Sequence, residues 1–278
     1  MHTLEFSLVV ALGSFLAGFL GSLTGLGGGV VIVPLLTLVF GVDMRYAIGA
    51  SLVSVIATSS GAAAAYLREG YSNMRVGMFL EIATTVGAVC GAVLAGHLST
   101  SVIAIVFGLV LLYSAYSSVQ THEELHKGLP PDRIATMLRM DGSYPTASGP
   151  ESYHVRQVPL GFGLMYAAGV LSGLLGIGSG AVKVLAMDQA MKIPFKVSST
   201  TSNFMIGVTA AASAGIYLRN GFIDPGLAMP VMLGVLLGAL TGARVLPGAK
   251  VRTLRMGFGV VIAVLAVEMI MQGVRGRL

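Results

Sequence analysis

Lys183 is the residue of this sequence with the clearest chemical implication. It lies in the apolar segment 181–191, three residues after the Gly-rich stretch Gly176–Gly180. A charge inside a lipid bilayer is costly and usually marks the path of a substrate or an ion. A lysine near a helix N-terminus also opposes the helix dipole unless an anion joins it. The position predicts contact with an anionic substrate or counter-ion; the alternatives are a side chain that reaches the cytoplasmic face and a pair with Asp188.

Neutral donors gather near two Gly-rich breaks, Gly176–Gly180 and Gly25–Gly29, each of which precedes a short apolar segment. Unpaired N–H groups at the start of a helix favour anions, and glycine lets the backbone approach a ligand closely. Hydroxyls and amides can donate to an oxyanion, and Asn203 is the best single neutral candidate. The alternatives are close helix packing without a ligand and hydroxyls that bond their own backbone. The predicted substrate-binding residues are Thr24, Gly25, Gly27, Gly28, Gly29, Ser51, Ser54, Gly176, Gly178, Ser179, Gly180, Lys183, Thr201, Ser202 and Asn203.

Other reactive side chains argue against an enzyme. Catalysis within the membrane would need a Ser–His pair, a metal cluster or paired carboxylates, and all five histidines lie outside the apolar segments or at their ends. His122 and His126 could hold a metal at helical spacing, but a solvated loop is the favoured interpretation. Glu81 and Glu268 lie within apolar segments, where either could carry a coupling proton; interfacial or packing roles are favoured for both. The sequence predicts no catalytic residue, no metal and no cofactor.

The elements that position these residues are membrane helices. Of the 278 residues, 55% are hydrophobic and 10% are charged, whereas soluble domains contain about 25% charged residues. The sequence therefore predicts an all-α polytopic protein in a lipid bilayer, and attributes the net charge of +5 to cytoplasmic loops rather than to nucleic-acid binding. Segments 30–40 and 181–191 are about half the length of a span. The expected full spans are 4–23, 46–67, 76–97, 99–118, 158–175, 197–218, 226–246 and 253–272.

The sequence repeats itself at an offset of 151 residues. Gly25–Gly29 aligns with Gly176–Gly180, and Tyr66–Gly70 aligns with Tyr217–Gly221. An odd number of crossings in each half would give two inverted-topology repeats of about five helical segments, an architecture of many secondary transporters. The expected units are a first repeat at 1–118, a flexible cytoplasmic linker at 119–157 with a short helix around 133–140, and a second repeat at 158–278. The distribution of Lys and Arg places the linker in the cytoplasm and both termini outside.

The paired motifs resemble those of the TauE/SafE sulfite exporter family. They comprise Gly21-x-x-x-Gly25-x-Gly27-Gly28-Gly29 with Val33-Pro34 and the segment 47–51, then Gly173-x-x-Gly176-Ile177-Gly178-Ser179-Gly180 with the segment 200–204. The resemblance implies a secondary transporter of the bacterial inner membrane that exports a small anion, sulfite or an organosulfonate, by alternating access. A carboxylate permease and a passive anion channel are the alternatives, and a homodimer is left open.

Overall fold

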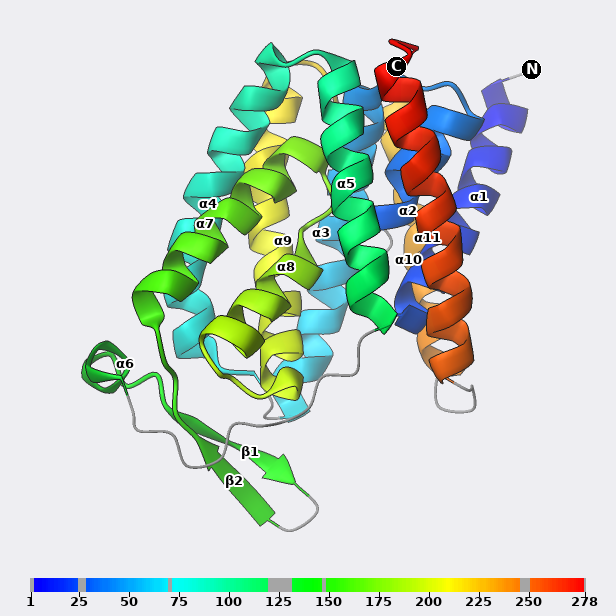
Figure 1. Cartoon of the computed structure of the whole chain (residues 1–278). Coiled ribbons are helices and arrows are strands. Elements are labelled where there is room, and N and C mark those ends of the chain that lie inside the picture. Colours follow the sequence, from blue (N-terminus) through cyan, green and yellow to red (C-terminus); the bar gives the residue numbers. More distant parts are fainter. Residues whose placement is uncertain are drawn as a thin grey trace.

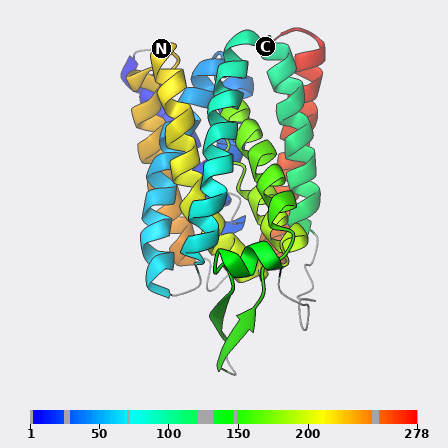
Figure 2. The same cartoon turned by 90° about the vertical axis from the view of Figure 1, so that its left-hand side faces the viewer.

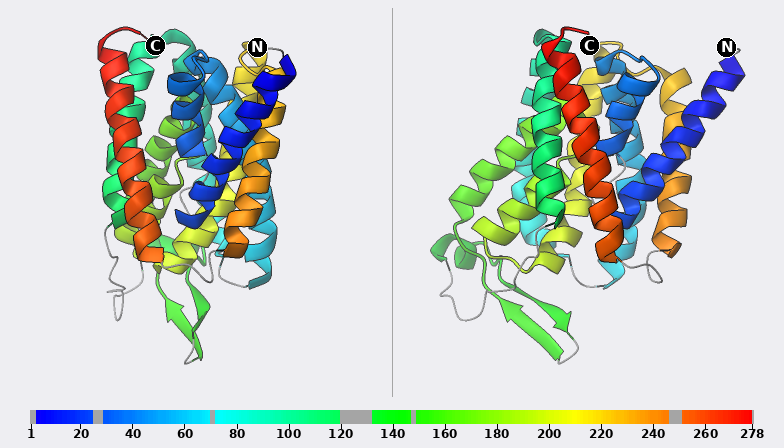
Figure 3. Two further views of the ribbon diagram at one scale, coloured as in Figure 1. Left: turned by 90° about the vertical axis from the view of Figure 1, so that its right-hand side faces the viewer. Right: turned by 45° about the vertical axis from the view of Figure 1, so that its right-hand side comes forward.

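The computed structural model describes residues 3–24, 29–69, 72–119, 132–146, 149–245 and 251–277. These residues form a bundle of helices with one small β-hairpin, so the predicted all-α polytopic fold is confirmed (Figure 1). Both ends of the chain lie at one end of the bundle, and the hairpin lies at the other (Figures 2 and 3). The elements are α1 (Thr3–Thr24), α2 (Gly29–Pro34), η1 (Leu35–Val39), α3 (Met44–Glu69), α4 (Met74–His97), α5 (Thr100–Val119), α6 (Arg133–Met137), β1 (Gly142–Thr146), β2 (Gly149–Tyr153), α7 (Val158–Leu175), α8 (Gly180–Leu185), η2 (Ala186–Ala190), α9 (Phe195–Arg219), α10 (Pro225–Val245) and α11 (Val251–Val274).

The outer surface of the bundle is apolar, as lipid contact requires. Leu12, Met78, Leu237 and Val264 on four different helices are all more than half exposed. Within the described residues, three helices are long and apolar enough to cross a membrane on their own: Met74–His97, Val158–Leu175 and Pro225–Gly242. The chain is therefore a membrane protein whose apolar side chains face both inward and outward.

The two short apolar segments are broken helices that turn back toward the end of the bundle from which they came. The Phe6 ring in α1 lies 6.1 Å from the Phe40 ring, just after η1. In the second half, the N–H of Arg156, just before α7, donates to the carbonyl of Met191, just after η2, at 3.0 Å. Because the start of each pair lies beside its end, α1–α2–η1 and α7–α8–η2 are re-entrant hairpins.

The bounds of these elements recur at the sequence offset. α8 and η2 begin and end 151 residues after α2 and η1, and α9 begins 151 residues after α3. Each short α-helix continues directly into a five-residue π-helix, a rare conformation that is frequent at functional sites. Pro34 in α2 cannot be the general cause of the change from α-helix to π-helix, because the corresponding residue in α8 is Leu185.

Glycines bring the longer helices into close contact. A Cβ atom added to Gly173 of α7 would collide with the carbonyl oxygen of Ala88 in α4. One added to Gly238 of α10 would collide with the carbonyl oxygen of Phe15 in α1. Small residues at helix crossings let backbones approach closely in membranes, so both pairs, α4–α7 and α1–α10, depend on glycine.

The segment between the two halves is more structured than a flexible linker. Its short helix α6 lies within the expected range, but the hairpin β1–β2 was not expected. Tyr144 and Tyr153 are buried on it, and the Asn73 side chain at the start of α4 donates to the Met140 carbonyl and to the Tyr153 hydroxyl, each at 2.8 Å. The prediction of flexibility is therefore wrong for the described part of 132–157, because two buried tyrosines and an asparagine fix the hairpin to the bundle.

Candidate functional site

The start of α2 and the second Gly-rich break lie side by side in the interior. A Cβ atom built on Gly29 would lie 3.0 Å from Ser51 Oγ and 3.4 Å from the carbonyl oxygen of Gly176. The Ser51 hydroxyl on α3 donates to that carbonyl at 2.8 Å. Thr24 is the last residue of α1, but its side chain lies outside the described part of the chain. Gly25, Gly27 and Gly28 lie outside it entirely. The structure thus joins the two halves where both short helices begin.

The second break has a backbone that requires glycine. Gly176 and Gly178 have φ values of +69° and +70°, and a Cβ on either would press against Ile48 or Ile206. Ser179 precedes Gly180, the first residue of α8, but its hydroxyl donates to the Ala168 carbonyl at 2.7 Å and does not cap α8. The first-turn N–H groups of α8 therefore receive no bond from the side chain at the capping position.

The remaining predicted hydroxyls brace the backbone. Ser54 donates to the Ala50 carbonyl in its own helix at 2.9 Å, and Ser202 donates to the Gly180 carbonyl at 3.3 Å. Thr201 Oγ1 accepts from the N–H of Asn73 at 3.0 Å. Asn203 is half-buried on α9. A hydroxyl group has only one proton to donate, and the hydroxyl protons of Ser54 and Ser202 already form hydrogen bonds to backbone carbonyls. A substrate role for these residues therefore stays a prediction.

Lys183 is fully buried in α8, so its side chain does not reach solvent. Its Nζ donates to Thr209 Oγ1 on α9 at 2.6 Å. Thr209 Oγ1 in turn lies 2.8 Å from Glu81 Oε1 on α4, to which it donates. Lys183, Thr209 and Glu81 thus form one network across three helices, which we call the charged network; a neutral hydroxyl stands between its two charges.

Glu81 and Thr209 were not among the predicted site residues. The sequence favoured an interfacial or a packing role for Glu81. Glu81 is only 9% exposed and lies between helices, so the interfacial role is wrong, whereas the packing role stays a prediction. The one available signal was the glutamate's position inside an apolar segment. Glu268 is half-buried on α11, where it accepts a bond from Gln272 at 3.0 Å.

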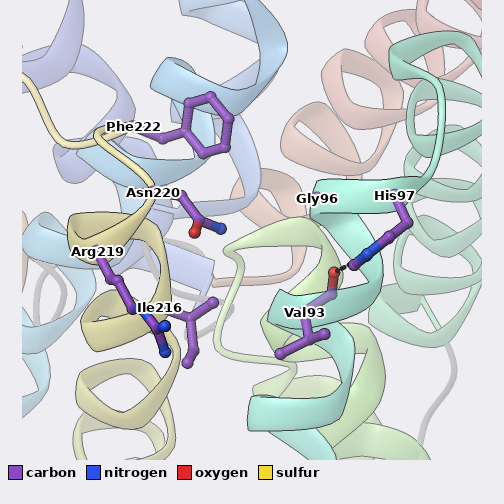
Figure 4. A pocket seen from close by; sticks show the side chains of 7 residues that line it. All are labelled: Val93, Gly96, His97, Ile216, Arg219, Asn220 and Phe222. Carbon is purple, nitrogen blue, oxygen red and sulfur yellow. Dashed lines mark hydrogen bonds between the residues drawn. The ribbon is translucent and has the colours of Figure 1, made fainter.

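A pocket of about 490 Å³ opens at the end of the bundle where the termini lie, between the last turns of α4 and α9 (Figure 4). Nearer the end of the bundle that carries the β-hairpin, α4 and α9 touch, because a Cβ atom on Gly77 of α4 would lie 3.1 Å from the methyl group of Thr201 in α9. The lining side chains that can donate hydrogen bonds are His97, Arg219 and Asn220. Such donors can form hydrogen bonds to an anion that enters the pocket.

The described residues contain no group of three or more His, Cys, Asp and Glu side chains that could hold a metal ion. The pair His122 and His126 lies outside the described residues.

A protein-family model described as "Sulfite exporter TauE/SafE" matches residues 10–269, which is nearly the whole chain. The chain belongs to the TauE/SafE family. The chain is similar to curated relatives throughout its length: the probable membrane transporter YunE of Bacillus subtilis is 27% identical over 98% of this chain and 99% of its own length. The probable membrane transporter YdhB of the same species is 28% identical over 85% of this chain and 89% of its own length. The probable membrane transporter MJ0441 of Methanocaldococcus jannaschii is 24% identical over 92% of each chain.

No solved structure is significantly similar to the chain. As a TauE/SafE protein whose relatives are named probable transporters, it is a membrane transporter and not an enzyme. The paired Gly-rich motifs correctly indicated the family.

Proposed function

We propose that this TauE/SafE protein is a secondary transporter that exports a small anion, sulfite or an organosulfonate, by alternating access. The observation that carries the proposal is Lys183, a fully buried ammonium group beside the uncapped start of a broken helix. A buried cation with three N–H donors, one of which is bonded to a neutral hydroxyl, is suited to hold an oxyanion.

The contact between the two halves supports a central binding site. Gly29 and Gly176 are neighbours, and each short helix runs from this region back to its own end of the bundle. We infer that the halves are related as inverted repeats. Rocking of the re-entrant hairpin α1–α2–η1 against the re-entrant hairpin α7–α8–η2 would then expose the site to each side of the membrane in turn. Export of sulfite or a sulfonate is inferred from the family.

The proposed orientation places the hairpin end in the cytoplasm and both termini outside, in the inner membrane of a bacterial cell. The basis is the excess of Lys and Arg in segments at the hairpin end. The pocket that contains Arg219 and His97 would then open to the outside and serve as the exit for the anion. The proposed partners are the bilayer and the substrate, without nucleic acid, and a homodimer fits the same proposal.

Anion-dependent thermal stabilisation of the purified protein tests the proposal. The probes are sulfite, sulfoacetate, isethionate, taurine, acetate, lactate and sulfate, applied to the wild type, to Lys183→Met and to Lys196→Met. Lys196 is an exposed lysine at the start of α9, so its variant removes the same charge from the surface. We expect sulfite or a sulfonate to stabilise the wild type and Lys196→Met, but not Lys183→Met.

Other outcomes would redirect or reject the proposal. Stabilisation by acetate or lactate alone would indicate a carboxylate permease with the same fold. Stabilisation by no anion would leave the Gly-rich breaks with a packing role only. Single-channel currents from the reconstituted protein would replace the transporter with a passive anion channel.

A further inference from the structure

The two oxygens of the Glu81 carboxyl group have different surroundings. Oε1 accepts hydrogen bonds from Thr209 at 2.8 Å and from Thr85 at 3.1 Å. Oε2 is buried and has no hydrogen-bond partner among the described residues. An ionised carboxylate with one unpaired buried oxygen is costly. A proton added to Oε2 would remove the charge without breaking either bond to Oε1.

Lys183 of α8 supplies the opposite charge in the charged network, with Thr209 as the bridge. The helices packed against α4 place few other titratable groups near Glu81. Tyr166 is the one titratable residue of α7, and the titratable residues of α9 lie near the ends of that helix. Asp188 is buried five residues beyond Lys183 on the same broken helix. The other titratable residues of α4 and α9 are Arg75, Cys90, His97, Lys196, Tyr217 and Arg219.

The repeat shows that packing alone does not require these charges. At the offset of 151, the position of Lys183 corresponds to Ile32, and that of Glu81 corresponds to Met232. Ile32 is fully buried in α2, as Lys183 is in α8. An apolar side chain therefore fills the matching position of the other half, and the charged network is an addition to the fold.

We propose that Glu81 binds the proton that accompanies the anionic substrate, and that its protonation releases the charge of Lys183 for that anion. The inference rests on the proposed function and adds the coupling ion to it. With Glu81 ionised and no substrate, the network is neutral, because the charges of Lys183 and Glu81 cancel. A monovalent anion alone would leave a buried net negative charge, whereas an anion with one proton keeps the site neutral.

Thr209 can adapt to either state of Glu81. Its single hydroxyl proton has two acceptors at 2.8 Å, Glu81 Oε1 and the Met205 carbonyl, while its oxygen accepts from Lys183. When hydronium gives its proton to Glu81 Oε2, one O–H bond of hydronium breaks, one O–H bond forms at Oε2, and water is released. Thr209 can then turn its own proton to Met205. Transport of one proton with one monovalent anion is electroneutral, so export would follow the combined concentration gradients of the anion and the proton rather than the membrane potential.

Isothermal titration of the purified protein with isethionate tests the coupling, because its sulfonate stays ionised across the pH range. Titrations in two buffers of different ionisation enthalpy count the protons taken up with the anion. The proteins are the wild type, Glu81→Gln and the matched control Glu268→Gln, which changes a glutamate on α11 outside the charged network. We expect uptake of up to one proton, and affinity that falls up to tenfold per pH unit, in the wild type and the control. Glu81→Gln should bind isethionate without proton uptake and independently of pH.

The wild-type titration alone decides whether anion binding is coupled to proton uptake, even if Glu81→Gln does not fold. Isethionate binding without proton uptake at any pH would overturn the inference and leave the proposed function intact. Continued uptake by Glu81→Gln would assign the proton to another group and overturn the role of Glu81. If neither isethionate nor any other anion of the stabilisation panel binds the wild type, the proposed function fails and the inference fails with it.

Discussion

Replacing both charges of the network should be much less harmful than replacing either one. Hydrogen bonds of 2.6 and 2.8 Å through Thr209 place Lys183 Nζ and Glu81 Oε1 about 5 Å apart. At an effective dielectric constant of about 20, their attraction is about 3 kcal/mol. Removing one partner of a buried pair costs about 3–5 kcal/mol, because the other charge remains buried without compensation.

We therefore expect Lys183→Met and Glu81→Gln each to lower the free energy of unfolding by about 3 kcal/mol. The double variant should lose no more than about 1 kcal/mol, since Met and Gln keep the shapes of the original side chains. The coupling free energy would then be about 5 kcal/mol, which exceeds the roughly 3 kcal/mol that neighbouring residues usually reach, because the second replacement also removes the buried charge that the first one leaves without compensation.

The assay is equilibrium unfolding in mixed micelles by titration with sodium dodecyl sulfate, followed by circular dichroism, without substrate and at one pH. Lys196→Met again controls for the loss of a lysine at the surface and should be close to wild type. If the losses of the two single variants simply add in the double variant, the two charges do not stabilise each other, and the electrostatic reasoning behind the charged network is refuted.

Three further predictions follow from contacts elsewhere in the bundle and use the same assay. Gly173→Ala should destabilise by about 1–3 kcal/mol through collision with a carbonyl of α4, while Gly163→Ala on the same helix, which meets no atom within 4 Å, should not; equal effects would contradict close packing. Ser51→Ala should cost about 1 kcal/mol through loss of its bond to the second break, and the equally buried Ser54→Ala, which loses a bond within one helix, should cost less. Burial raises the pKa of Tyr153 from 10 to about 12, so its contribution to stability is present below pH 10 and is lost as pH rises to about 12; Tyr153→Phe should flatten the stability curve in that range.

Most of the fold was predictable because hydropathy and glycine act locally. A run of about 20 apolar residues must form a helix in a bilayer, since only a helix pairs its own backbone groups there. The expected spans, including 76–97 and 158–175, agree closely with α4 and α7. The breaks before α2 and α8 were visible as glycines. That each short helix turns back was not predictable, because length alone does not distinguish a tilted crossing from a re-entrant hairpin.

The hairpin between the two halves shows the limit of composition. Pro and Gly in 119–157 favoured a flexible linker, yet Tyr144 and Tyr153 bury their rings and hold β1–β2 against the start of α4. Two aromatic residues in a polar segment do not indicate their partners. The contact with Asn73 depends on where the ends of α4 and α7 lie relative to each other.

For the candidate site, the sequence by itself determined that a lysine lies inside a membrane helix directly after a Gly-rich break. This follows from residue type and hydropathy, both of which are local. Only the tertiary structure decided that Lys183 meets Thr209 and Glu81, the latter two 128 residues apart. A contact between three helices depends on how each is rotated and packed, and those rotations are set by close glycine contacts such as that of Gly173 with α4. The charge could be read from the chain, whereas its partner required the fold.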